Sequence, residues 1–262
     1  MSLSVRELAP VRASTGLFAR FREAGTSTLL VAILNPIFVL GAMGLGLGSL
    51  IDGHRAQSLG GVDYLSFLAP GLMAAFAMQG AAQESLWPVL GGVKWEGNYI
   101  AQATTTLRPV DILRGQLLYT TMRVAISTTM TFLAMVLFGA VESWWGVLAV
   151  PTALLTGLAY AAPITAFSVT QQTDSAFPLI MRLGVIPSYL FSGTFFPITQ
   201  LPGSLQAVAK LTPLWHGVDL CRSLSLGTTT LVGAVVHVVY LTVFVAIAMR
   251  FGAYTFTRRL HQ

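Results

Sequence analysis

The chain has 262 residues, of which 54% are hydrophobic and only 10% are charged. This composition excludes an ordinary soluble globular domain, in which about 25% of residues are charged. The formal net charge of +5 does not indicate nucleic-acid binding, because membrane proteins carry excess Lys and Arg in their cytoplasmic segments. Cys221 is the single cysteine, which excludes an internal disulfide framework and a cysteine-based metal cluster within one chain.

The first 28 residues contain four arginines but no apolar core of their own, so no cleavable signal peptide is expected. A helix over 14–23 would place Leu17, Phe18 and Phe21 on one face and the charged residues away from it. Such a helix lies in the plane of the membrane interface. The alternative is an unstructured basic tail.

Apolar stretches of about 20 residues, long enough to span a bilayer as helices, follow in chain order. They predict an all-α polytopic membrane protein with six transmembrane helices in a single domain over 1–262. The spans are expected at 29–51, 64–91, 112–140, 147–170, 177–197 and 231–252.

The distribution of basic residues predicts the orientation of these spans. Eleven Lys and Arg residues lie in the N-terminal segment, the 92–114 connection, the start of the fifth span and the C-terminal end. Only Arg55, Lys210 and Arg222 lie in the opposite connections. Because Lys and Arg gather on the cytoplasmic side, both termini are expected in the cytoplasm.

The connection over 92–111 contains "KWEGNYIAQATTTLRPVD". Its apolar residues recur at helical spacing, which predicts one amphipathic helix over 94–108. The residues on its apolar stripe are Trp95, Tyr99, Ile100, Ala103 and Leu107. This helix would either float on the lipid surface or lie in the groove of a soluble partner, and both alternatives stay open.

The ionisable residues within the predicted spans include Glu84, Arg123 and Arg182. Charge within lipid is costly and is usually retained for a purpose. These residues either form an ion pair that ties cytoplasmic helix ends together or make a polar contact on a transport path. Asp219 and Arg222 lie one helical turn apart and are expected to pair locally.

The region over 198–230 follows the fifth span and does not resemble a plain external loop. This region and the residues just before it are divided into short pieces by one glycine and three prolines, namely Gly193, Pro197, Pro202 and Pro213. Each piece has apolar residues among polar ones. Two short re-entrant helices are expected, which dip partway into the outer leaflet where protein or a water-lined cavity covers them.

The histidines are scattered and lack the HExxH spacing of a zinc site, so no metal site is expected. His216, beside Trp215, is either structural or lines an exit. His237 is expected to be a packed or hydrogen-bonded residue of the last span. Nothing fits the phosphate-binding loop G-x-x-x-x-G-K-[ST], so the chain is not expected to hydrolyse ATP by itself.

Three stretches together resemble the permease subunits of type-2 ATP-binding-cassette exporters. They are "YLSFLAPGLMAAFAM", "LFSGTFFPITQLPGSLQAVAKLTPLWHGVDLCRSLSLG" and the basic C-terminal end. The chain is most similar to the single-domain permeases for lipo-oligosaccharide (nodulation factor) and daunorubicin-type drug export, over nearly its whole length. The resemblance implies that 94–108 is the coupling helix that docks on the ATPase, and that 198–230 caps the pathway from outside.

The resemblance also implies the function and partners. The chain would be the transmembrane subunit of an exporter of an amphipathic drug, lipid or glycolipid in the cell membrane. A separate nucleotide-binding subunit would bind ATP and Mg²⁺, and a second copy or a related permease would complete a dimer among membrane lipids. Spans two and five would face the dimer seam with an adaptable apolar lining: Met73, Phe76, Met78, Tyr189, Phe191, Phe195 and Phe196.

Two other classes of protein remain as alternatives. A secondary transporter would favour inverted repeats with broken helices near the middle of the membrane. A membrane-embedded lipid-modifying enzyme would need convergent polar or metal-binding residues at one membrane face. The sequence does not indicate the substrate.

Overall fold

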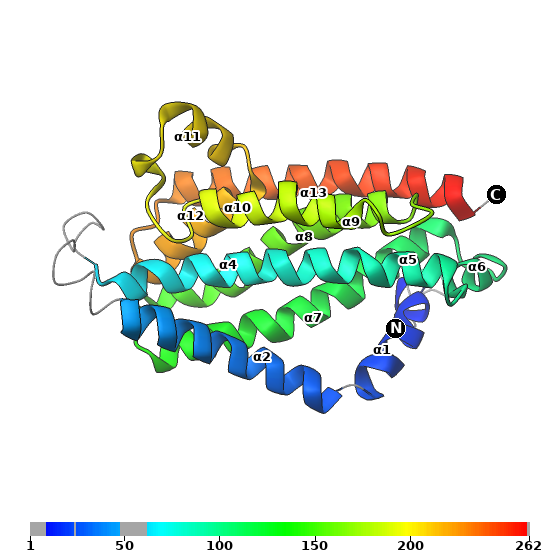
Figure 1. Ribbon diagram of the computed structural model, residues 1–262, viewed down its shortest axis with the longest axis horizontal. Coiled ribbons are helices and arrows are strands. Elements are labelled where there is room, and N and C mark those ends of the chain that lie inside the picture. The colour runs from blue at the N-terminus through cyan, green and yellow to red at the C-terminus, as the bar shows by residue number, and fades with distance from the viewer. Residues whose placement is uncertain (1–8, 24, 48–61, 261–262) are drawn as a thin grey trace.

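A computed structural model describes residues 9–23, 25–47 and 62–260 (Figure 1). Every regular element in these ranges is a helix, which confirms the predicted all-α fold. Helices are expected from long apolar runs, since a helix satisfies all of its interior backbone hydrogen bonds within one segment.

The described chain begins with α1 (Ala9–Glu23), which packs on α7 (Pro109–Leu137) and buries Ala13 and Ser14. The helix predicted over 14–23 is therefore present, and its place in a membrane interface stays a prediction. Leu17 is half-buried, whereas the side chains of Phe18 and Phe21 lie outside the described part of the structure.

The first predicted span corresponds to α2 (Gly25–Leu40), which contains Pro36 and continues as the π-helix η1 (Gly41–Leu47). Residues 48–51 of the predicted span lie outside the described residues. Helix α2 packs along α7, while η1 contacts α4 (Tyr64–Ser85).

The centre of the bundle is α4, in which nearly every residue is buried. Asp63 caps it by accepting a hydrogen bond from the Ser66 amide at 3.1 Å, and α5 (Trp87–Lys94) follows it directly. Small residues of α4 allow α7, α8 (Ala149–Ser168) and α12 (Pro213–Leu226) to approach closely.

Within the described residues, four helical segments are long and apolar enough to cross a membrane. They are Tyr64–Lys94, Pro109–Leu137, Trp144–Ser168 and Leu231–Leu260. The third combines the 3₁₀-helix η3 (Trp144–Leu148) with α8, and the fourth is α13. The first and fifth predicted spans coincide with shorter apolar helices, Leu30–Met43 and Phe177–Phe191, so six crossings stay a prediction.

The fifth predicted span consists of α9 (Phe177–Ile180), the π-helix η4 (Met181–Val185) and α10 (Ile186–Phe191). The wider π-turn lies directly before Pro187, which lacks an amide hydrogen to donate. The prediction that this helix continues to residue 197 is wrong, because the chain leaves the helix after Phe191 and turns at Gly193.

Beyond that turn lie η5 (Ile198–Gln200), α11 (Gly203–Lys210) and α12. Each of the three prolines predicted to divide this region marks a helix start, with Pro197 and Pro202 capping η5 and α11 and Pro213 beginning α12. Two short helices therefore lie where they were predicted. Their re-entrant position in a membrane stays a prediction.

Figure 1 shows how the ends of the chain lie relative to these elements. Helix α1 and the C-terminal end of α13 lie at the same end of the bundle as α6 (Asn98–Ala103), and α11 lies at the opposite end. This arrangement agrees with both termini and the α6 connection sharing one side of a membrane.

Candidate functional site

The connection between α5 and α7 folds differently from the single amphipathic helix predicted over 94–108. Helix α5 ends at Lys94, and Gly97 has a left-handed backbone with φ of 66°. Helix α6 then runs only over Asn98–Ala103. The prediction of one stripe is wrong, because Trp95 precedes the break at Gly97 and Leu107 follows the end of α6.

Tyr99 anchors α6 to the bundle. Its side chain is 3% exposed, and its hydroxyl donates a hydrogen bond of 2.7 Å to the Gln116 Oε1 of α7. Gln116 Nε2 in turn donates to the main-chain oxygen of Glu84 at 3.0 Å. Helix α6 is thus tied to α7 and α4 by buried hydrogen bonds. Gln116 was not predicted from the sequence as a functional residue, although a side-chain amide inside an apolar predicted span could have indicated it.

The other aromatic residue of this connection points outward. Trp95 is 65% exposed and Ile100 is 54% exposed, whereas Ala103 and Leu107 are half-buried. A groove of 690 Å³ runs between α1, α5 and α6. Its lining includes Leu17, Trp87, Trp95, Glu96 and Gln102. The end of the bundle at α6 therefore offers apolar anchors beside a groove, as interface hot spots usually do.

Of the ionisable residues Glu84, Arg123 and Arg182, the first two meet. Arg123 of α7 lies 3.1 Å from the Glu84 carboxylate of α4, so an ion pair is present for these two, although Arg123 lies in the middle of α7 and not at a helix end. Arg182 lies on η4, where it is exposed, and is not part of this pair.

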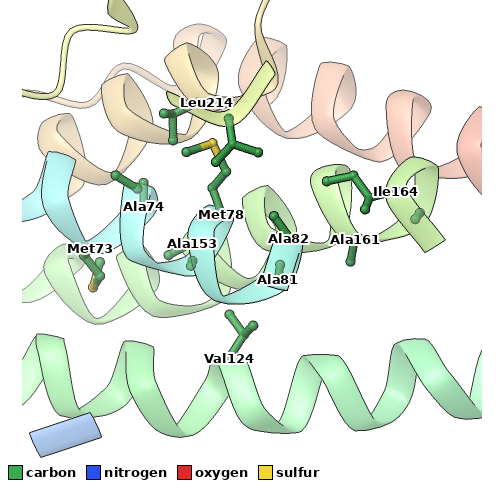
Figure 2. Close-up of a cluster of buried hydrophobic side chains, with 14 of the residues drawn as sticks. Met73, Ala74, Met78, Ala81, Ala82, Val124, Ala153, Ala161, Ile164 and Leu214 are labelled. Atoms are coloured by element: carbon green, nitrogen blue, oxygen red, sulfur yellow. The ribbon is translucent and has the colours of Figure 1, made fainter. Parts of the chain in front are cut away.

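The predicted lining residues separate into two groups. Met73 and Met78 are fully buried, and Figure 2 shows Met78 pointing toward Leu214 of α12 among buried alanines of α4 and α8. The prediction that these two methionines line a pathway is wrong, since they fill the core of one protomer.

The other predicted lining residues keep some exposure. Phe76, Tyr189, Phe195 and Phe196 are half-buried, and Phe191 is exposed. Tyr189 packs edge-on against Phe195 with ring centroids 4.9 Å apart. Their role in a pathway stays a prediction.

The turn after α10 is held by Arg222 of α12. Its Nε donates to the Phe67 carbonyl at 2.9 Å, and one terminal nitrogen donates to the Gly193 carbonyl at 2.8 Å. The guanidinium also lies 3.8 Å over the Phe67 ring, a cation–π contact. Gly193 itself has φ of 82°, which favours glycine. A tight turn is therefore present where Gly193 was predicted to matter.

Asp219 and Arg222 attract each other electrostatically, as expected of residues one helical turn apart, but the close contact of Asp219 is with a different element. His237 Nε2 of α13 lies 3.1 Å from the Asp219 carboxylate, and His237 Nδ1 lies 2.9 Å from His216 Nδ1. The hydrogen bond from His237 is the main cause that lowers the pKa of Asp219. This network joins α12 to α13.

His216 is buried and has a structural position. Its ring stacks on Tyr240 with centroids 3.7 Å apart. Burial, and then the neighbouring His237, lower the pKa of His216 to about 4. Within the described ranges, no group of three or more His, Cys, Asp or Glu side chains could hold a metal ion.

Comparison with known proteins gives the class of this bundle. The model of the family described as "ABC-2 type transporter" matches residues 16–226, and the chain belongs to this family. It is therefore a multi-pass membrane subunit of a transporter. Subunits of this class normally work with an ATPase subunit.

Several curated relatives carry one name. The chain is 31% identical to nodulation protein J of Bradyrhizobium diazoefficiens and 29% identical to that of Rhizobium leguminosarum bv. trifolii, in both cases over 93% of this chain and 90% of the relative. Nodulation protein J of Rhizobium meliloti is 26% identical over 80% of this chain and 79% of the relative. The predicted resemblance to nodulation export permeases is confirmed.

Proposed function

We propose that the chain is the transmembrane subunit of an ATP-driven exporter that moves an amphipathic drug, lipid or glycolipid out of the cytoplasm or the inner leaflet. Membership of the ABC-2 type transporter family and the similarity to nodulation protein J support this proposal. ATP and Mg²⁺ bind to a separate nucleotide-binding subunit, since this sequence contains no phosphate-binding loop.

The observation that carries the proposal is the arrangement of α6 and of the turn that precedes it. Trp95 and Ile100 are exposed at the end of the bundle, while Tyr99 fixes the same segment to α7 through Gln116. A subunit without its own motor must receive movement through a contact with the ATPase. An element with exposed anchors and a rigid attachment to the transmembrane helices suits that task.

The proposal includes an orientation and an assembly. The α6 end and both termini face the cytoplasm, and α11 lies outside the cell membrane. A second copy or a related permease covers the exposed apolar side chains of η4 and α10, which include Leu183, Ile186, Leu190 and Phe191. Membrane lipids contact the remaining apolar surface, such as the exposed valines of α13.

Co-purification with the partner ATPase subunit tests the docking surface. Trp95→Ala and Ile100→Asp are expected to lower recovery of the ATPase, because anchor side chains carry most of the energy of an interface. Leu205→Asp is the matched control, since Leu205 is exposed on α11 at the other end of the bundle.

Three outcomes separate the proposed function from its alternatives. Loss of the ATPase in the α6 variants but not in the control supports docking at α6. Full recovery with both variants overturns the docking assignment. Transport by the chain in the absence of any ATPase would indicate a secondary transporter instead.

A further inference from the structure

A cavity of 390 Å³ opens at the side of the bundle between α2, α4 and α7. Helix α2 packs along α7 and reaches α4 mainly through η1. Figure 1 shows α2 and α7 diverging toward the end at which α1 lies. All three helices contribute side chains to the lining of the cavity.

The cavity contains the polar side chains that are costly inside a membrane. The Glu84–Arg123 pair lies in its lining, and both side chains keep some exposure, 17% for Glu84 and 29% for Arg123. Gln83 and Asn35 lie in the same lining and are exposed. A purely structural ion pair would be closed off by packing, whereas this one borders open space.

Apart from Ser127, the remaining lining is apolar and includes Val31, Phe76, Val124 and Ile126. A cavity with a polar part and an apolar part suits an amphipathic molecule better than a polar solute. The pair supplies one negative and one positive charge, so the site has no net charge to attract an ion. Its carboxylate accepts hydrogen bonds, while the guanidinium and the two amides donate them.

We propose that this cavity binds the uncharged, hydroxyl-bearing headgroup of an amphipathic lipid that arrives sideways from the membrane. The proposal rests on the proposed export function and gives its substrate class. With α6 on the cytoplasmic side, Glu84 lies about 15 Å along the helix from Lys94, at 1.5 Å per residue, which corresponds to the inner leaflet.

The site also has a physical connection to the proposed ATPase contact. The main-chain oxygen of Glu84 accepts the hydrogen bond of Gln116, and Gln116 accepts that of Tyr99 in α6. A bound headgroup at the Glu84 carboxylate is therefore joined to α6 through this chain of contacts.

Native mass spectrometry of the full chain in detergent tests the proposal. The chain is mixed with monoglucosyl diacylglycerol or with phosphatidylglycerol, and the lipid retained on the protein is counted. Asn35→Leu combined with Gln83→Leu removes two donors without touching the ion pair, and Ser127→Leu narrows the cavity. Gln200→Leu, at an exposed position of η5, is the matched control.

The wild type and the control should retain the glucolipid about tenfold better than the double variant, since each lost hydrogen bond contributes modestly. Ser127→Leu should show a similar loss. Equal retention by all four proteins overturns the site, and a preference for phosphatidylglycerol overturns the uncharged headgroup. The assay contains no ATPase, so either failure would leave the co-purification result, and with it the proposed function, standing.

Discussion

At the scale of single residues, Arg222 determines where the fifth apolar helix gives way to a turn. Its guanidinium binds carbonyl oxygens of Phe67 and Gly193, which lie far from it in sequence. Spacing alone predicted a pair with Asp219, because residues one turn apart on a helix are neighbours. The two charges do attract each other, but the hydrogen bonds of the guanidinium go to carbonyl acceptors that only the fold brings to it.

Gly193→Leu is expected to destabilise this turn by about 1–2 kcal/mol, the usual cost of a side chain in the left-handed region. A Cβ at this position would also lie 3.1 Å from Ile198. Transport by the reconstituted complex should fall, while the ATPase still co-purifies. Gly203→Leu is the control, because a Cβ there has open space and an ordinary backbone. Normal transport with Gly193→Leu would contradict the tight turn.

His216 is expected to make stability depend on pH. Its pKa is lowered from 6.5 to about 4, so between these values the unfolded chain takes up a proton that the folded chain does not. The free energy of unfolding is therefore highest, as far as His216 is concerned, above about pH 6.5, and it decreases as the pH falls toward 4. Asp219 titrates below this window, because its pKa is lowered from 3.8.

Melting temperatures in detergent at pH 7.5 and pH 5.5 measure this dependence. The wild type should melt at a lower temperature at pH 5.5, and His216→Gln should show a smaller difference between the two conditions. An equal difference in both proteins would show that His216 does not contribute.

At the scale of elements, α6 shows the limit of reading a helix from periodicity. The sequence correctly places a helix with apolar residues in the 92–111 connection. Periodicity could not reveal that Gly97 divides the segment, nor that Tyr99 points inward while Ile100 points outward. Tyr99 points inward because its hydroxyl binds the side-chain oxygen of Gln116, which lies in another helix.

Tyr99→Phe should weaken the link between α6, where the ATPase is proposed to bind, and the transmembrane helix α7. The variant keeps the aromatic ring that packs against Phe256 but removes the hydrogen bond to Gln116, at a cost of about 1 kcal/mol. Co-purification of the ATPase should stay normal, while stimulation of ATP hydrolysis by substrate should fall. Tyr254→Phe, at an exposed position of α13, is the control.

A double-mutant cycle checks the contact itself. The effects of Tyr99→Phe and Gln116→Leu on the free energy of unfolding should be less than additive, because both remove the same hydrogen bond. Strict additivity would contradict a direct interaction between the two side chains.

At the scale of the whole molecule, the all-helical fold and the four described helices that are long and apolar enough to cross a membrane follow from the length and apolarity of their segments. The sequence could not show which apolar side chains face a neighbour within the protomer. Met73 and Met78 were predicted to line a pathway, yet they lie in the core, because α8 and α12 both pack on α4. Such contacts depend on tertiary arrangement, which a single helical pattern does not contain.

The predicted topology is tested with single cysteines in a Cys221→Ala background. Ser204→Cys on α11 should react with a membrane-impermeant maleimide added outside intact cells, and Thr104→Cys should react only after the membrane is opened. Both positions are exposed, so a lack of reaction reflects the membrane and not burial. The reverse labelling pattern would overturn the proposed orientation.

The contacts of Arg222 also set an order of events during biosynthesis. The Phe67 carbonyl that it binds is separated from it by 155 residues, so the ribosome exposes the acceptor on the order of 10 s before the donor, at roughly 5–20 residues per second. The Gly193 carbonyl precedes Arg222 by only 29 residues, so the turn at Gly193 has no guanidinium to hold it for roughly the last few seconds of that interval. A nascent chain released before residue 222 would therefore present an unfinished turn at this end of the bundle to the quality-control machinery of the membrane.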